Sequence, residues 1–221
     1  MNWTRRLKYN DPTYIHPVTL ITKRAVDILI AMLGLVVFAP VMALIALTVV
    51  LDSPGGVFYR QIRVGRVWPD RAEFFHIVKF RSMYANAESI TGPVWAARED
   101  PRITRVGRFL RKMRLDELPQ FVNVLRGDMS IVGPRPERPS FHHRLEIEIP
   151  FYTERTYGIS PGITGLAQIY QGYDNSIDDV RSKVRYDHAY AVALTGFFTW
   201  FRMDLFIAVQ TLKIVLFGRG Q

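Results

Sequence analysis

The sequence of 221 residues contains no cysteine and lacks several motifs on which common enzyme classes depend. Without cysteine it has no disulfide framework and no thiolate metal site, and this composition agrees with a reducing compartment. It contains no P-loop, no GxGxxG fingerprint and no GxSxG elbow, so the usual phosphate cradles and the α/β-hydrolase nucleophile are excluded. The histidines are scattered, and the adjacent His142 and His143 do not have the spacing of metal ligands on a helix.

Acidic residues are the minority among the charged residues. The 20 Asp and Glu stand against 29 Lys and Arg, which gives a formal net charge of +9. A basic protein attracts partners that carry phosphate. Nucleic acid is not the expected partner, because no recognised binding motif accompanies the charge. The length predicts one compact unit, and no small-residue cleavage site follows the apolar region, so no secretory signal is expected.

Residues 28–51 form a run without charge, long enough for the roughly 20 apolar residues that a bilayer crossing requires. Pro40 removes a backbone donor near the middle of this run, so a bend or break is predicted there. Basic residues flank the run on both sides, and the positive-inside rule therefore assigns both ends to the cytoplasm. They are Arg5, Arg6, Lys8, Lys23 and Arg24 before the run, and Arg60, Arg63 and Arg66 after it. We predict a re-entrant helix-break-helix hairpin over residues 23–52, with a kinked spanning helix as the alternative.

A second membrane signal lies near the C-terminus. Residues 196–218 interleave aromatic side chains with Arg202, Asp204 and Lys213. This mixture suits the headgroup boundary of a bilayer better than its hydrocarbon centre. An amphipathic core helix of a soluble domain is the alternative.

The polar middle of the chain predicts a mixed α+β unit. Two apolar stretches at 57–67 and 73–83, separated by WPD, indicate a strand pair. Residues 102–114 are predicted to be helical but interrupted at Gly107, and a further helix is expected from Pro119 to Gly127. The prolines of residues 133–139 predict a rigid loop, followed by a helix over 139–149.

Five arginines recur at every third position of this middle region and would form a slowly winding band on a helix. They are Arg102, Arg105, Arg108, Arg111 and Arg114. Such a band could face phosphate, nucleic acid or anionic lipid, or it could be an ordinary solvated surface. It runs into Asp116 and Glu117 and is followed by Arg135 in the proline-rich loop. Guanidinium groups held in this way can bind phosphate through two hydrogen bonds.

The adjacent carboxylates Asp116 and Glu117 have two interpretations. The dipeptide alone favours a helix N-terminus, where acidic side chains interact well with the dipole and Pro119 fits just inside the helix. Alternatively, one carboxylate attacks phosphorus while the other assists or positions the substrate. Magnesium would suit such a site, because it takes oxygen ligands and bridges substrate phosphates.

Six short motifs follow one another along the chain. They are KRAVDI at 23–28, FYRQIRVG at 58–65, KFRSM at 79–83, DPRITRVGRFLRK at 100–112, LDELPQFVNVLRGDMSIVGPRPE at 115–137 and PGITGLAQI at 161–169. In this order they resemble the bacterial sugar transferases, the monotopic phosphoglycosyl transferases, over residues 23 to 218. The resemblance departs at Ala39, where the family carries serine before the proline, and at Leu166, where many members carry tryptophan.

The resemblance implies a reaction. Family members transfer a phosphosugar from a UDP-sugar to a polyprenol phosphate such as undecaprenyl phosphate, and they release UMP. By motif, Asp116 would be the nucleophile and would bind Mg²⁺, and Glu117 would be its essential partner. Substrate-binding or active-site positions would be Lys79, Arg111, Arg135 and, on the shortest match, Asp187.

The resemblance also implies an organisation and a location. A basic segment at 1–22 and a re-entrant membrane helix at 23–52 would precede a compact, mainly helical α+β catalytic domain at 53–221 that ends in interfacial amphipathic helices. The active site would face the cytoplasm at the bacterial inner membrane, in contact with membrane lipids. There it would initiate the assembly of an exopolysaccharide, capsule or O-antigen. The sequence leaves open whether the protein forms a homodimer, and no residue identifies the sugar.

Two other classes of function remain as alternatives. The first is a membrane-anchored scaffold that keeps the fold without activity, although the intact Asp116, Glu117 and Arg135 argue against it. The second is a basic membrane-surface module that binds anionic lipid or nucleic acid. Neither would release UMP from a UDP-sugar.

The hairpin prediction can be tested by labelling, because the natural chain has no cysteine to interfere. A single cysteine introduced near residue 10 is expected to react with a membrane-impermeant maleimide only from the cytoplasmic side. Labelling of this cysteine from the periplasmic side would instead show that the helix spans the membrane.

Overall fold

The structure is a computed structural model that describes residues 14–87, 100–171 and 176–217. This part of the chain is mainly helical, with two small two-stranded sheets. The elements in order are α1 (Pro17–Asp52), β1 (Phe58–Trp68), β2 (Arg71–Phe80), α2 (Arg105–Lys112), η1 (Leu115–Glu117), α3 (Gln120–Arg126), β3 (Ser130–Val132), α4 (Pro139–Glu148), η2 (Glu154–Thr156), β4 (Gly162–Thr164), α5 (Leu166–Tyr170), α6 (Ile177–Ala193) and α7 (Phe197–Leu216). The predicted mainly helical α+β composition is confirmed.

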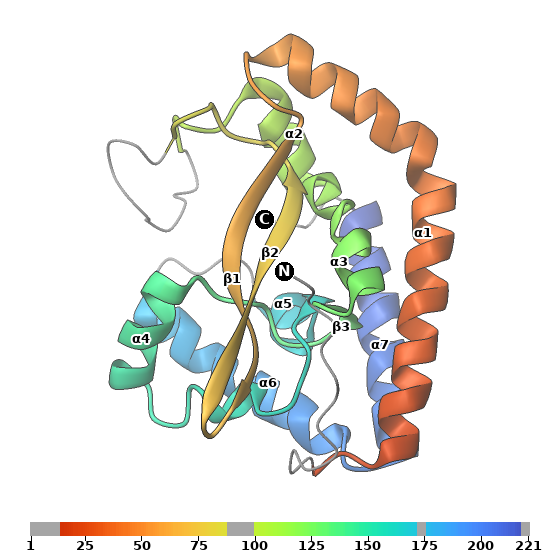
Figure 1. Ribbon diagram of the computed structural model, residues 1–221, viewed down its shortest axis with the longest axis vertical. Helices are drawn as coiled ribbons and strands as arrows, with labels where there is room; N and C mark the ends of the chain where they lie inside the picture. The colour runs from red at the N-terminus through yellow and green to blue at the C-terminus, as the bar shows by residue number, and fades with distance from the viewer. Residues whose placement is uncertain (1–13, 88–99, 172–175, 218–221) are drawn as a thin grey trace.

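The long helix α1 begins at Pro17, six residues before the predicted start of the membrane segment at residue 23. It continues through Pro40 as one helix, and Figure 1 shows its orange C-terminal part turning away from the direction of the first part. The structure thus has the predicted bend but not a break. By length and composition α1 could cross a bilayer. Its re-entrant topology stays a prediction.

Most of the apolar surface of α1 is not covered by the rest of the chain. Leu33, Val36 and Leu51 are 64%, 74% and 75% exposed, while only a narrow stripe that includes Ala31 and Ile45 is buried. Soluble monomers rarely expose a continuous apolar surface of this length. This exposure is what a helix surrounded by lipid requires.

The N-terminal part of α1 is fastened to the end of α3 by one arginine. The guanidinium of Arg24 donates from Nη1 to the carbonyl of Val124 at 2.6 Å and from Nη2 to that of Leu125 at 2.9 Å. The last carbonyls of a helix have no partner within the helix, so these two bonds cap α3. At this end α3 stops at Gly127, whose left-handed φ of 89° suits glycine, as the sequence predicted.

Two other charged residues of the KRAVDI motif join α1 to different parts of the fold. Lys23 Nζ lies 2.7 Å from Asp204 Oδ2 on α7. Asp27 Oδ1 accepts hydrogen bonds from Ser130 Oγ at 3.0 Å and from the backbone N–H of Ile131 at 2.9 Å on β3. The motif therefore holds α1 against α7 and β3 as well as α3.

Strands β1 and β2 form the predicted antiparallel pair. Phe58 is opposite Phe80 and Trp68 is opposite Arg71, with the turn at residues 69–70, as the WPD signal predicted. The hairpin is long and twisted, and Figure 1 shows it crossing the middle of the molecule. Lys79 lies one residue before the end of β2.

The predicted interruption of a helix at Gly107 is wrong, because Gly107 lies inside α2. A Cβ atom at this position would lie 2.0 Å from the carbonyl oxygen of Ser82. The glycine therefore allows α2 to pack directly on the backbone that follows β2. Thr104 caps the helix by accepting a hydrogen bond from the N–H of Gly107 at 2.9 Å.

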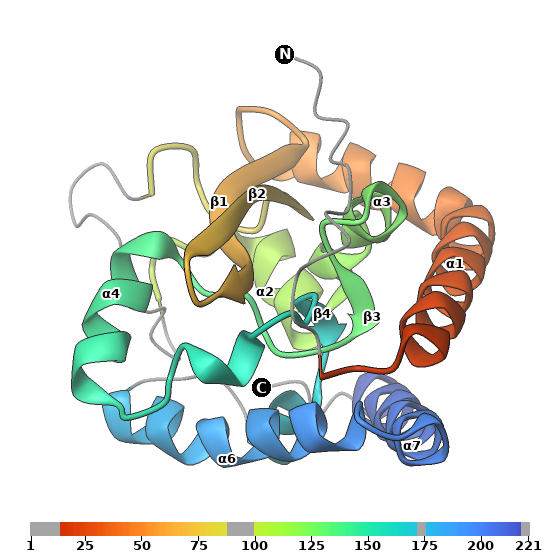
Figure 2. The same cartoon turned by 60° about the horizontal axis from the view of Figure 1, so that its bottom comes forward.

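The second half of the chain surrounds the short parallel pair β3 and β4. The loop at residues 133–138 between β3 and α4 has no regular structure, and α4 follows it, as predicted. Figure 2 shows α6 running along one side of the molecule, from α4 towards α7. Leu145 and Ile149 from the α4 region pack against Val180 and Val184 of α6.

The C-terminal helix α7 lies beside α1 in both views (Figures 1 and 2). Its Trp200 and Ile207 are buried in the core, while Phe198 and Leu212 are exposed. The helix thus supplies one face to the core and presents apolar side chains on another. Its predicted place at the membrane interface stays a prediction.

Candidate active site

Asp116 and Glu117 both lie in η1, a short 3₁₀ turn between α2 and α3. Arg114 has a left-handed φ of 54° at the point where the chain leaves α2 and enters this turn. The first turn of α3 contains no acidic residue, and Pro119 caps this helix without a side-chain hydrogen bond. The helix-cap interpretation of the pair is therefore wrong. Both carboxylates are buried.

Glu117 is held between two cations from distant parts of the sequence. Its Oε1 lies 2.7 Å from Lys79 Nζ on β2 and 3.0 Å from Arg135 Nη2 in the loop after β3. The fold thus brings three of the predicted site residues into direct contact. Because Glu117 and Lys79 are largely shielded from water, the carboxylate depends on the two cations that contact it, although Arg135 is 29% exposed.

Asp116 is adjacent to this cluster, but its bonding is different. Its Oδ1 is buried and accepts no hydrogen bond from the part of the chain that the structure describes. A buried acceptor without a partner is unfavourable, and such atoms in native structures often serve a ligand or a reaction. Asp116 therefore has one oxygen available for a bound group.

The environments of the two carboxylates separate their pKa values. Burial raises the pKa of Asp116, and the neighbouring Glu117 raises it further, against the lowering effect of Lys79, Arg111 and Arg135. Burial also acts to raise the pKa of Glu117, but Lys79 and Arg135 together hold it far below its ordinary value. Glu117 is thus a fixed anion, while Asp116 is the more basic carboxylate. Two neighbouring carboxylates separated in this way are suited to different roles.

Arg111, a predicted site residue, lies near the end of α2 and close enough for its charge to lower the pKa of Asp116. The predicted band of five arginines is not one continuous surface. The three on α2 are Arg105, Arg108 and Arg111. Arg102 precedes the helix and pairs with Asp100 at 2.6 Å, and Arg114 lies beyond its end.

Asp187, the fourth predicted substrate-binding residue, is buried on α6 and engaged by Arg155. Arg155 Nη1 donates to Asp187 Oδ2 at 2.5 Å, and its Nη2 donates to the hydroxyl of Tyr152 at 2.8 Å. The same guanidinium lies 4.3 Å from the centre of the Tyr152 ring. Asp187 and Arg155 thus form a buried ion pair.

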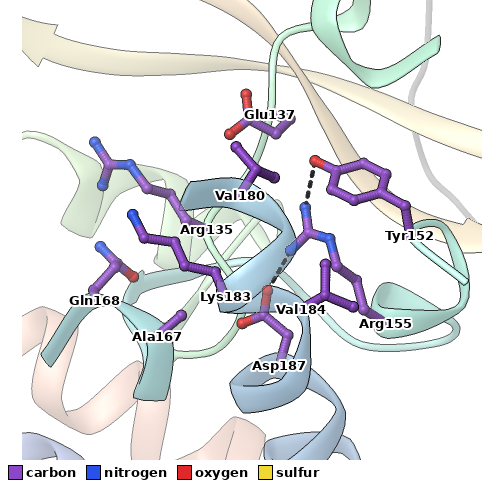
Figure 3. A pocket seen from close by; sticks show the side chains of 10 residues that line it. All are labelled: Arg135, Glu137, Tyr152, Arg155, Ala167, Gln168, Val180, Lys183, Val184 and Asp187. Carbon is purple, nitrogen blue, oxygen red and sulfur yellow. Dashed lines mark hydrogen bonds and ion pairs between the residues drawn. The ribbon is translucent and has the colours of Figure 1, made fainter. Parts of the chain in front are cut away.

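A small pocket is lined by Asp187 and by Arg135, the residue that also contacts Glu117 (Figure 3). Arg135 lines this pocket together with Gln168, Lys183 and Asp187, and the same Arg135 binds Glu117. Figure 3 shows the polar ends of Arg135, Gln168 and Lys183 on one side, and Arg155 between Asp187 and Tyr152 on the other. The pocket therefore shares Arg135 with the candidate active site and is basic on one side.

Several polar residues of this pocket, among them Lys183, Gln168 and Arg155, were not predicted from the sequence. Lys183 and Asp187 are four residues apart on α6, and this spacing could have indicated that they share a face. Gln168 lies inside the PGITGLAQI motif, and its buried Oε1 has no partner in the described part of the chain. No local pattern marks Arg155, because its pairing with Asp187 spans 32 positions of sequence.

Asp116 is the candidate protein ligand for the predicted magnesium ion. Within the described residues, no group of three or more His, Cys, Asp or Glu side chains is arranged to hold a metal ion. Mg²⁺ in phosphate chemistry commonly uses one or two carboxylates and takes its remaining ligands from water and substrate. The unpartnered Oδ1 of Asp116 fits that pattern, whereas Glu117 is already bound by two cations.

Glu117→Gln is expected to destabilise the protein by about 3 kcal/mol, because Lys79 and the partly exposed Arg135 lose the buried carboxylate that both of them contact. Since the pKa of Glu117 is lowered on folding, its stabilisation is complete above its ordinary pKa of 4.5 and is lost as the pH falls below that value. The difference in unfolding free energy between wild type and variant should therefore shrink on acidification. Chemical unfolding in one detergent over a series of pH values measures it.

Glu73→Gln is the matched control for this prediction. Glu73 pairs with Arg66 of the same hairpin at 3.3 Å, but its side chain is 19% exposed against 8% for Glu117, and its hydrogen bonds to Arg66 and Trp68 are long at 3.3 Å. The control should therefore cost only about 0–1 kcal/mol. Equal losses in the two variants would contradict the role given to the Glu117 cluster.

Comparison with known proteins shows the family of this chain. Residues 18–218 match the bacterial sugar transferase family. The chain is 43% identical over 204 residues to UDP-N-acetylgalactosamine-undecaprenyl-phosphate N-acetylgalactosaminephosphotransferase of Aeromonas hydrophila, covering 92% of this chain and 46% of the relative. It is 42% identical over 192 residues to UDP-glucose:undecaprenyl-phosphate glucose-1-phosphate transferase of Escherichia coli K12, covering 81% and 38%.

A shorter relative is covered more fully. The chain is 46% identical over 136 residues to a putative undecaprenyl-phosphate N-acetylgalactosaminyl 1-phosphate transferase of Bacillus subtilis, covering 62% of this chain and 73% of the relative. The chain spans less than half the length of the Aeromonas and Escherichia proteins. The family match nevertheless covers nearly all of it, including η1, α3 and the pocket. The chain therefore belongs to the bacterial sugar transferase family.

Proposed function

We propose that the protein transfers a phosphosugar from a UDP-sugar to undecaprenyl phosphate or a similar polyprenol phosphate, with release of UMP. The observation that carries this proposal is the buried Asp116, which has an unpartnered oxygen beside a Glu117 fixed by Lys79 and Arg135. The names of the relatives support the donor and acceptor classes. Those names include both glucose and N-acetylgalactosamine, so the sugar stays open.

In the first step, a carboxylate oxygen of Asp116 attacks the phosphorus that carries the sugar. A bond forms between this oxygen and phosphorus, and the bond from phosphorus to the bridging oxygen breaks. UMP leaves with that electron pair, and the phosphosugar remains on Asp116 as an acyl phosphate. The raised pKa of Asp116 supports this role, because a more basic carboxylate is a better nucleophile once it is deprotonated.

In the second step, a phosphate oxygen of the polyprenol phosphate attacks the same phosphorus. The bond to Asp116 breaks, the carboxylate is regenerated, and the product is a polyprenol diphosphate sugar. The covalent intermediate allows a soluble donor and a lipid acceptor to react one after the other. They need not occupy the site together.

The cations around the pair have an electrostatic role in both steps. Negative charge develops on the leaving phosphate, and preorganised cations in a site with little water stabilise it strongly. Arg135 is suited to this task because it reaches both Glu117 and the adjacent pocket. Glu117 would hold Lys79 and Arg135 in position and would not itself attack phosphorus.

Magnesium is proposed as the cofactor, held at Asp116. When bound, the ion supplies charge neutralisation for the diphosphate. The chain contributes the buried oxygen of Asp116, and its cations remain available for other phosphate oxygens. The raised pKa of the Asp116 carboxyl implies that binding of a cation would also favour its ionised form.

The proposed location is the cytoplasmic face of the bacterial inner membrane. The exposed apolar surface of α1, its bend and the exposed aromatic side chains of α7 support attachment to one leaflet. This location would bring the site to the level of the lipid phosphate. There the reaction would start the assembly of a surface glycan.

UMP release tests the proposed reaction. Purified protein with undecaprenyl phosphate and Mg²⁺ should release UMP from at least one member of a panel containing UDP-glucose, UDP-galactose and their N-acetylated relatives. With that donor labelled in the sugar phosphate and no acceptor present, label should remain on the protein, and Asp116→Asn should abolish it. Asp70→Asn, in the exposed hairpin turn, should retain full labelling. Label on the Asp116→Asn protein would remove Asp116 as the nucleophile.

Removal of metal tests the cofactor. Chelation with EDTA should stop UMP release, and added Mg²⁺ should restore it. Mg²⁺ with the UDP-sugar should also raise the melting temperature of the wild-type protein, by an amount that grows with the concentration of bound ligand. Asp116→Asn should lose the part of this shift that depends on Mg²⁺. Unchanged activity in EDTA would rule out a required divalent ion.

A further inference from the structure

A groove with a volume of about 570 Å³ lies between the C-terminal half of α1 and the helix α2, away from the pocket next to Arg135. Its α1 wall contains Leu44, Ile45, Thr48 and Asp52, and its α2 wall contains Arg105, Val106, Phe109 and Leu110. Figure 1 shows α2 near the bent end of α1. The volume falls in the range of about 300–1,000 Å³ that is typical of small-molecule sites.

The floor of the groove is packed and its rim is open. Ile45 and Leu110 are 6% and 1% exposed, whereas Leu44 and Phe109 are 63% and 59% exposed. On α1 the open rim continues into apolar residues that the rest of the chain does not cover, including Leu47. With α1 in the bilayer, a hydrocarbon chain could therefore enter the groove from the side without passing through water.

Positive charge lies along the α2 side of this apolar groove. Arg105 lines it and Arg108 lies three residues further along the helix, and both are exposed. Neither forms an ion pair with the described part of the chain. The only carboxylate in the lining, Asp52, accepts a hydrogen bond from the N–H of Val106 at 3.0 Å. This combination is complementary to a ligand with a long apolar tail and an anionic head.

The groove is coupled by packing to the candidate active site. Leu110 in its floor belongs to a buried cluster with Ile45 and Phe80, and Leu115 packs against that cluster. Leu115 directly precedes Asp116 in η1. Phe80 likewise directly follows Lys79 on β2. A ligand in the groove would thus contact Ile45 and Leu110, which belong to the same packed cluster as the neighbours of the nucleophile and of Lys79.

We propose that this groove binds the isoprenoid chain of the lipid acceptor and so guides its phosphate towards Asp116. The inference rests on the proposed function and adds the place where the acceptor is recognised. It commits to the polyprenol chain, because the groove joins the lipid-facing surface of α1 to the packing around η1. A tail of a membrane phospholipid is the competing occupant.

Thr48→Trp tests the proposal, because an indole at this half-buried lining position would fill part of the groove. Loss of packing contacts between the groove and the isoprenoid chain should raise the KM for undecaprenyl phosphate about tenfold. The KM for geranyl phosphate, whose chain is too short to need the groove, should change less than about twofold. Acceptor-free labelling of the protein from the UDP-sugar should be unchanged.

Leu47→Trp is the matched control, with the same new side chain one residue away on the exposed face and outside the lining. It should leave the KM for both acceptors unchanged. An equal rise in KM for the long and short acceptors in Thr48→Trp would overturn the proposal, and so would an unchanged KM for undecaprenyl phosphate. Loss of the protein from liposomes without a change in KM would assign the groove to phospholipid and would also overturn it.

The same assays separate this inference from the proposed function. If wild-type protein takes no label and releases no UMP with any donor, the proposed reaction fails. If wild-type protein transfers normally and Thr48→Trp does not discriminate between acceptors by chain length, only the groove assignment fails.

Discussion

The buried carboxylate of Glu117 is the interaction on which the arrangement of the site depends. It neutralises Lys79 from the β-hairpin and Arg135 from the loop after β3, at 2.7 and 3.0 Å. Without this anion, two cations would be held in a poorly solvated space, and the hairpin and the loop would repel each other there. The desolvation cost of these charges is offset only because the anion contacts both cations. The result is a preformed cationic surface next to Asp116, which is what a reaction at a diphosphate requires.

The position of that surface relative to α1 depends on the KRAVDI motif. Arg24 caps the far end of α3, and the near end of α3 follows directly from η1. Lys23 and Asp27 fasten the same turns of α1 to α7 and β3. α1 is therefore tied to a helix whose first residue, Gln120, lies three positions after Glu117. If α1 rests in one leaflet, its depth sets the height of Asp116 above the lipid.

Local signals in the sequence predicted much of the fold, and tertiary contacts account for the errors. The hairpin turn at WPD, the helix between Pro119 and Gly127 and the proline loop all follow from backbone preferences of single residues, and all are confirmed. The predicted interruption at Gly107 is wrong because the glycine is needed where the backbone of Ser82 approaches the helix. No local sequence pattern encodes that tertiary contact. The predicted band of arginines is wrong for a similar reason. Arg114 has a left-handed backbone conformation and Arg102 pairs with Asp100 before the helix, so neither continues the helical repeat. The family resemblance named the site residues, but only the fold explains why Lys79, Glu117 and Arg135 belong together.

The two openings near the carboxylate pair differ in chemistry as the two proposed substrates do. The pocket shared by Arg135, Gln168 and Lys183 has a volume of only about 20 Å³ and is basic on one side, so it offers cationic contacts to part of an anionic donor. The groove between α1 and α2 is apolar with arginine beside it, which suits a lipid phosphate. The pocket is linked to Glu117 by Arg135. The groove is linked to Asp116 by the packing of Leu110 and Leu115. A transferase that handles its substrates in turn needs a group that keeps the phosphosugar between them, and a buried carboxylate with one unpartnered oxygen can serve as that group.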